Sequence, residues 1–387
     1  MKLRLAQAGV HRTCVRSGLA FAGIAIWVAF SLRVPAVRAQ EAPKLFIDED
    51  CQAFDISKDN SIVYAVPRLK RVRNLVIERD DISIASDGKV RKIVEADKFM
   101  PFPPPAGYII DSILWSPDGH RIAVNMSLQK APPGFTDKDA KKRGDLGDDD
   151  DNKPISSVTG GRVIALLDDD GREIKVANSK TRFVEDATNG TWLADNTHIV
   201  YQTGGGPYSI TRVNVTDGKS EELFEGHTFN GILWDAKNNR AYAIGENLGV
   251  HKGLTIVRLD LLHETVTEIA HVKNYQGALS LSPSGDKIGY FEDGDYLDVI
   301  DMKNQMKSAR VRAGYGRFEW SRDERRVLLK RGSFEKSGIL TWVGLYDDSF
   351  TPELHSLVFH DFHITPDEQM IAVTEPGKRA LKVYPLP

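Results

Sequence analysis

The chain has 387 residues, of which 51 are Lys or Arg and 54 are Asp or Glu, and 41% are hydrophobic. This length is sufficient to bury a sizeable apolar core. The formal net charge of −3 excludes a strongly basic nucleic-acid-binding protein. Two cysteines, Cys14 and Cys51, are too few for a disulfide-stabilised fold.

Residues 1–39 differ in composition from the rest of the chain. They contain six basic residues, no acidic residue and a 16-residue uncharged run from Ser17 to Leu32, and Val37-Arg38-Ala39 resembles a cleavage site. These features are typical of a secretory signal peptide, and the run is shorter than the roughly 20 residues that span a bilayer. An uncleaved anchor is the alternative. Cleavage would leave 45 basic and 54 acidic residues, a net charge of −9. We expect a periplasmic or secreted domain over residues 40–387 without a membrane span.

A short pattern recurs seven times after residue 50: a large anchor residue, a turn of four residues, and a second apolar run. It is clearest in Trp115-Ser116-Pro117-Asp118-Gly119, where Pro presets φ and Gly accepts the positive φ that closes the turn. An apolar residue precedes six of the anchors by two positions, with Gly190 as the exception, and this alternation predicts a strand. The anchors are Ile56, Trp115, Trp192, Trp234, Leu281, Trp320 and Ile364.

The anchors are separated by 59, 77, 42, 47, 39 and 44 residues. Four of these intervals match the roughly 40–50 residues of a four-stranded propeller blade. A strand at 44–48 precedes the first repeat, and the last repeat, from Phe362, has room for three strands. We therefore predict an all-β, seven-bladed β-propeller that is closed by the N-terminal strand, with almost no helix; six blades are the alternative.

Two segments interrupt the regular pattern. In the first repeat, the apolar runs at 74–78 and 81–85 predict strands on either side of Arg79-Asp80. In the second repeat, a charged insertion at about 130–161 explains the interval of 77 residues. Its low apolar content predicts a solvated loop.

The insertion also contains weak calcium candidates. Asp148, Asp150 and Asn152 alternate like ligands of a calcium loop. An EF-hand, however, requires Gly at its sixth position and Glu at its twelfth, where this sequence has Lys153 and Thr159. We expect no cofactor, with calcium as the alternative.

The repeats Leu114-Trp115-Ser116-Pro117-Asp118-Gly119 and Leu281-Ser282-Pro283-Ser284-Gly285 resemble the WD40-like propeller repeats of the TolB family and of prolyl oligopeptidase-type peptidases. The resemblance covers roughly residues 50–387 and implies the propeller only. TolB has an additional N-terminal α/β domain and six blades, and the peptidases have an α/β-hydrolase domain. No G-x-S-x-G nucleophile motif and no phosphate-binding P-loop motif occurs in the sequence. The resemblance therefore does not supply a function.

Charged residues are concentrated at the first strands of repeats six, seven and one, which closure of the ring makes neighbours. On the face opposite the anchors we expect Arg317 and Glu319, then Asp361 and His363, and finally Asp55. This cluster is either an ion-pair network between blades or a binding site at the mouth of the channel. The candidate binding residues are Asp55, Arg317, Glu319, His360, Asp361 and His363. No catalytic or metal residue is assigned.

These observations favour a monomeric binding or scaffold module whose partner is a protein or a cell-envelope component, and not nucleic acid. Rigid blades present loops around a ring without requiring any chemistry. A lactonase- or lyase-like enzyme acting at the axial funnel is the alternative, and an accessory chain for a separate hydrolase is a third possibility. We expect a protein that is not an enzyme.

Overall fold

The computed structural model describes residues 45–72, 75–99, 107–129, 159–179, 183–204, 208–225, 227, 229–246, 253–293, 296–312, 317–331, 339–347, 350–354, 361–374 and 380–386. The chain divides after Ala39 into two units, and all these residues belong to the second. In the described ranges the structure is built from β-strands and one 3-10 helix, η1 (Ala236–Asn238). No helix among them is long and apolar enough to cross a membrane.

The described strands form seven four-stranded antiparallel sheets, which are the blades. Blade 1 consists of β2 (Ala53–Ile56), β3 (Ile62–Val72), β4 (Leu75–Ser86) and β5 (Lys89–Val94). Blade 2 consists of β6 (Tyr108–Trp115), β7 (Arg121–Gln129), β8 (Thr159–Asp168) and β9 (Val184–Glu185). Blade 3 consists of β10 (Ala187–Trp192), β11 (His198–Thr203), β12 (Ser209–Asn214) and β13 (Ser220–Leu223).

The remaining four blades are built in the same way, except that the outer strand of blade 7 comes from the N-terminal end of the domain. Blade 4 consists of β14 (Phe229–Asp235), β15 (Arg240–Glu246), β16 (Leu254–Asp260) and β17 (Thr265–Val272). Blade 5 consists of β18 (Tyr275–Leu281), β19 (Lys287–Glu292), β20 (Tyr296–Asp301) and β21 (Met306–Arg312). Blade 6 consists of β22 (Phe318–Trp320), β23 (Arg326–Arg331), β24 (Ile339–Gly344) and β25 (Phe350–Leu354). Blade 7 consists of β26 (Asp361–Ile364), β27 (Met370–Thr374), β28 (Ala380–Pro385) and β1 (Leu45–Asp50).

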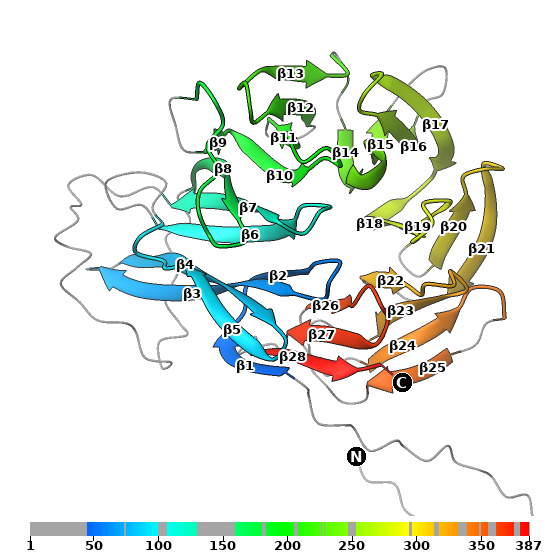
Figure 1. The fold of residues 1–387 in the computed structure, drawn as a ribbon. Helices are drawn as coiled ribbons and strands as arrows, with labels where there is room; N and C mark the ends of the chain where they lie inside the picture. The colour runs from blue at the N-terminus through cyan, green and yellow to red at the C-terminus, as the bar shows by residue number, and fades with distance from the viewer. Residues whose placement is uncertain are drawn as a thin grey trace, which may run out of the picture. The chain divides into compact units, whose positions relative to one another are not determined.

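The blades form a ring in which the first strand of each repeat lies nearest the centre (Figure 1). The ring is closed by β1, which pairs antiparallel with β28 through Leu45↔Val383 and Ile47↔Leu381. The N-terminal strand is therefore the outer strand of the last blade, and the prediction of seven blades closed in this way is confirmed.

Apolar side chains pack between neighbouring blades. Each of seven core clusters joins one blade to the next, and the last, which includes Phe54 and Leu381, joins blade 7 to blade 1. The second strand of each blade serves two clusters, because successive side chains in a strand point to opposite faces. Tyr290, for example, packs toward blade 4, and the next residue, Phe291, packs toward blade 6.

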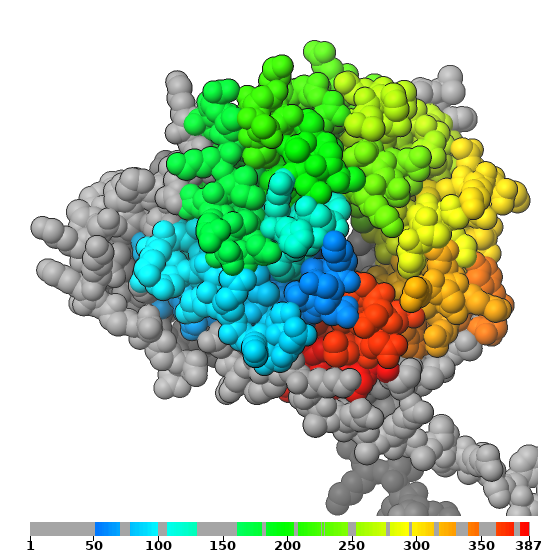
Figure 2. All heavy atoms as spheres, in the orientation of Figure 1, coloured from blue at the N-terminus to red at the C-terminus, as the bar shows by residue number. Residues whose placement is uncertain are grey.

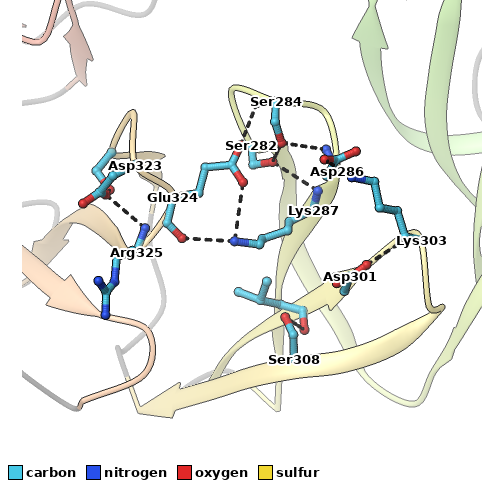
Figure 3. Close-up of polar contacts among 12 residues, drawn as sticks. Ser282, Ser284, Asp286, Lys287, Asp301, Lys303, Ser308, Asp323, Glu324 and Arg325 are labelled. Atoms are coloured by element: carbon cyan, nitrogen blue, oxygen red, sulfur yellow. Dashed lines mark hydrogen bonds and ion pairs between the residues drawn. The ribbon is translucent and has the colours of Figure 1, made fainter.

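The turns between the first and second strands place one residue of each blade at positive φ. Gly119 and Gly285 accept this conformation without strain, whereas Glu324 and Glu368, both at φ 55°, are less suited to it. Figure 3 shows the Glu324 side chain extending from the turn of blade 6 to the turn of blade 5. Its carboxylate accepts a hydrogen bond of 2.6 Å from the backbone N–H of Ser284 and lies 3.4 Å from the Lys287 ammonium group.

The prediction of two separate strands on either side of Arg79-Asp80 is wrong. Residues 75–86 form a single strand, β4, that passes through Arg79 and Asp80 while paired with β3. Both polar side chains are buried there with partners: Arg79 donates to Asp97, and Asp80 accepts a hydrogen bond from the backbone N–H of Ile110. The strand continues because the segment after β5 supplies Asp97 and the neighbouring blade supplies Ile110, which local sequence does not reveal.

Candidate functional site

The residue directly before each anchor occupies an equivalent place in every inner strand. In blades 1, 6 and 7 this residue is Asp55, Glu319 and His363. In blades 4 and 5 it is Leu233 and Ser280. The side of the ring formed by blades 6, 7 and 1 is therefore charged, as predicted, and the opposite side is mainly apolar or neutral.

Arg317, Glu319, Asp361 and His363 form one hydrogen-bonded network across blades 6 and 7. The Arg317 guanidinium donates to Asp361, and its Nη2 lies 2.8 Å from Nε2 of His363 and 3.4 Å from Glu319. Nδ1 of His363 lies 3.0 Å from Oε1 of Glu319.

Two carboxylates of the cluster also join adjacent blades through the main chain. Oε2 of Glu319 accepts a hydrogen bond of 2.6 Å from the backbone N–H of Ile364 in the next blade. Oδ2 of Asp55 accepts one of 2.8 Å from the backbone N–H of Trp115, again in the next blade. The repeat of this contact at equivalent positions indicates that both carboxylates hold the ring together.

The pKa values of these two carboxyls nevertheless shift in opposite directions. Burial raises the pKa of Asp55, and this effect exceeds the lowering by His363 and the Trp115 N–H. Burial also acts to raise the pKa of Glu319, but its direct contact with His363 and the nearby Arg317 leave that pKa below its usual value. The difference arises because Glu319 hydrogen-bonds to His363 directly.

A cavity of about 990 Å³ lies among the inner strands and turns of blades 4–7. Its wall includes the turn residues Lys237, Pro283, Arg322 and Glu368, so it reaches the face of the ring that carries the turns between first and second strands. We call this the turn face. Figure 2 shows that the ring is hollowed at its centre.

The cavity contains some of the predicted site residues and not others. Arg317, Glu319 and His363 line its wall, whereas Asp55 and Asp361 are not among the lining residues. His360 lies outside the described residues, as do Asp148, Asp150 and Asn152. Among the described side chains, no group of three or more His, Cys, Asp and Glu residues could hold a metal ion.

Two basic residues of the wall were not predicted. Lys237 and Arg322 lie in the turns that follow the anchors Trp234 and Trp320, and both are exposed. Neither turn requires a basic side chain at this position. A basic residue that the turn itself does not need is the sequence feature that could have suggested a binding role. That they share one cavity depends on the arrangement of the blades.

No protein-family model and no curated protein matches the sequence. Among solved structures, the chain is similar to one from the crystal structure of a mitotic checkpoint complex, with a TM-score of 0.57 and 13% identity. The match covers 96% of this chain and 99% of that chain and supports the propeller fold. As many as 1339 chains of solved structures match, so the fold by itself does not select a function.

Proposed function

We propose that this chain is an exported, TolB-like β-propeller that binds a protein or cell-envelope partner at its turn face. The proposal is based on the cavity of about 990 Å³, which is lined by apolar and basic side chains from four blades. Clefts of this size with a few polar groups among apolar walls are the usual form of a binding site. The composition of residues 1–39 supports export.

The network of Arg317, Glu319 and His363 contributes a rigid wall. The hydrogen bonds of Glu319 to Ile364 and His363 fix the relative positions of blades 6 and 7. A scaffold needs such a fixed surface, because a preorganised site loses less conformational entropy on binding.

Photo-crosslinking in cells of the native host tests the proposal. A crosslinking amino acid in place of Arg322 should capture a specific protein or envelope component, whereas one in place of Lys98, an exposed residue beyond β5 and outside the cavity wall, should not. The mature N-terminus, read by mass spectrometry, should be Gln40. Equal capture from both positions, or an intact Met1, would contradict the corresponding half of the proposal.

The enzyme alternative rests on one observation. His363 is hydrogen-bonded to Glu319 in the cavity wall beside Arg317, and such a pair has the chemistry of a general base next to an anion-binding group. Lactone hydrolysis or substrate elimination that is lost in His363→Gln, while the fold is retained, would favour the enzyme over the scaffold.

A further inference from the structure

Among the residues that line the cavity, the basic side chains Lys237, Arg317 and Arg322 outnumber the carboxylates of Glu319 and Glu368. Both wall carboxylates are already engaged, since Glu319 accepts from the backbone of Ile364 and Glu368 accepts from the backbone of Arg322. In the described part of the chain, by contrast, the Lys237 ammonium and the Arg322 guanidinium have neither a hydrogen bond nor an ion pair. Arg317, in contrast, is paired with Asp361 and Glu319. The wall therefore has two cations without a direct ion pair among the described residues, although the chain as a whole is acidic.

Apolar surface lies in the same wall as these cations. Leu233, Leu281 and Ile364 are only half-buried where they line the cavity, and Pro283 and Pro366 are exposed. A small inorganic anion would leave this surface in contact with water. A ligand that carries apolar groups next to its negative charges would cover it.

A second apolar feature lies on the same face, further from the axis. Leu262, Met306 and Tyr346 are 54%, 66% and 51% exposed and occur at the turns between the third and fourth strands of blades 4, 5 and 6. In an antiparallel blade these turns lie at the same end as those between the first and second strands. Three strand spacings of about 4.8 Å separate inner from outer strands, so the rim lies roughly 15 Å from the cavity, a distance that four or five extended residues can span.

We infer that the turn face of blades 4–7 binds an extended acidic segment of a partner protein, in which Glu or Asp side chains alternate with apolar ones. The carboxylates pair with Lys237 and Arg322, and the apolar side chains cover Leu233, Leu281 and Ile364. The segment then continues outward over the exposed apolar rim. This inference rests on the proposed function and specifies the chemistry of the partner.

Capped seven-residue peptides test this chemistry with the full exported chain, by fluorescence anisotropy. A peptide of alternating Glu and Leu should bind, and its affinity should fall as salt is raised. Peptides of Gln and Leu, of Glu and Ser, or of Lys and Leu should bind at least about tenfold more weakly. The first and third lack negative charges for the basic residues, and the second lacks apolar side chains for the apolar wall. Equal binding of the Gln and Leu peptide, or displacement by butyrate at equal concentration, would overturn the inference.

Protein variants provide the matched control. Lys237→Glu combined with Arg322→Glu should weaken binding of the Glu and Leu peptide at least about tenfold, since both contacts become repulsive. Arg325→Glu makes the same charge change as Arg322→Glu alone, in the same turn, at an exposed residue that does not line the cavity. It should leave the affinity within about twofold, whereas Arg322→Glu alone should weaken binding clearly. Equal loss in both variants would indicate a general effect of charge and refute the site. If crosslinking at Arg322 persists while no acidic peptide binds, the proposed function stands and this inference fails.

Discussion

Adjacent aspartates in β4 occupy opposite electrostatic environments. Asp80 is fully buried, and burial, together with the negative charges of Glu78 and Asp111, raises its pKa well above the usual value. Burial also acts to raise the pKa of Asp81, but Lys92 at 2.7 Å, the Ala96 N–H at 2.8 Å and Arg68 outweigh it, so this pKa is lowered. The pKa values of these two neighbouring aspartates are therefore shifted in opposite directions by the fold.

This contrast predicts opposite pH dependences for two isosteric substitutions. The folded protein holds the Asp80 proton more tightly than the unfolded chain does, so its contribution to stability is lost as the pH rises above about 4 toward the folded-state pKa. Asp80→Asn removes this loss, and the variant should gain relative to the parent by up to about 1.4 kcal/mol per pH unit over that range. Urea unfolding at several pH values measures the difference.

Asp81→Asn is the control, with the opposite sign. The lowered pKa of Asp81 stabilises the fold above about pH 4, and that stabilisation is lost as the pH falls through the folded-state value. The variant should be less stable than the parent at pH 7, by an amount that shrinks in acid. If Asp80→Asn is less stable than the parent at every pH, Asp80 is ionised in the folded protein and our assignment is wrong.

At the scale of elements, the turns of blades 6, 7 and 1 each connect their blade to the one before it. The positive-φ residues of blades 6, 7 and 1 all reach backward: Glu324 to Ser284, Glu368 to Arg322, and Asn60 to Asp367. In the first of these contacts, Figure 3 shows Glu324 between Ser284 and Lys287. A residue type that is poorly suited to the left-handed conformation is tolerated because its side chain supplies a contact between blades.

Two substitutions at Glu324 separate the backbone cost from the side-chain contact. Glu324→Ala keeps a Cβ at φ 55° and loses the hydrogen bond to Ser284, which should cost roughly 1.5–3 kcal/mol. Glu324→Gly loses the same bond but relieves the strain, so it should be more stable than the Ala variant by about 1 kcal/mol. Thermal and urea unfolding measure both. Equal stabilities would show that φ carries no strain, and parent-like stability in both would show that the contact contributes nothing.

At the scale of the whole ring, stability depends on pairing between the two ends of the domain. Strand β1 completes blade 7 beside β28, and the cluster that includes Phe54, Tyr64 and Leu381 lies where blades 7 and 1 meet. An unpaired outer strand would expose backbone groups that favour aggregation.

Deleting residues 44–49 should therefore leave blade 7 with three strands and an open edge at β28. We expect a loss of roughly 2–4 kcal/mol, from several backbone hydrogen bonds at about 1 kcal/mol each, and increased aggregation. Deleting residues 40–43, which precede the strand, is the matched control and should have little effect. Parent-like melting and solubility of the 44–49 deletion would mean that ring closure by β1 contributes little to stability.

The sequence by itself determined the number of blades, the turns and the closing strand. These features depend on local signals, namely alternation along each strand and the conformational preferences of Gly, Pro and Asn. It also predicted that Arg317, Glu319, Asp361 and His363 come together, because alternation fixes the face of each residue and ring closure fixes which blades are neighbours.

Only the tertiary structure decided features whose partners come from another blade. Gly190, the exception to the alternation, lies close to the neighbouring blade: a Cβ there would lie 2.2 Å from Cδ1 of Ile164, which would have to shift, and Asn125 in blade 2 hydrogen-bonds to its backbone. Likewise, Arg322 became a binding candidate only when the turns of four blades were seen to wall one cavity. Local sequence encodes conformation along the chain, whereas the distances between blades, and so the site, are set by how seven sheet faces pack together.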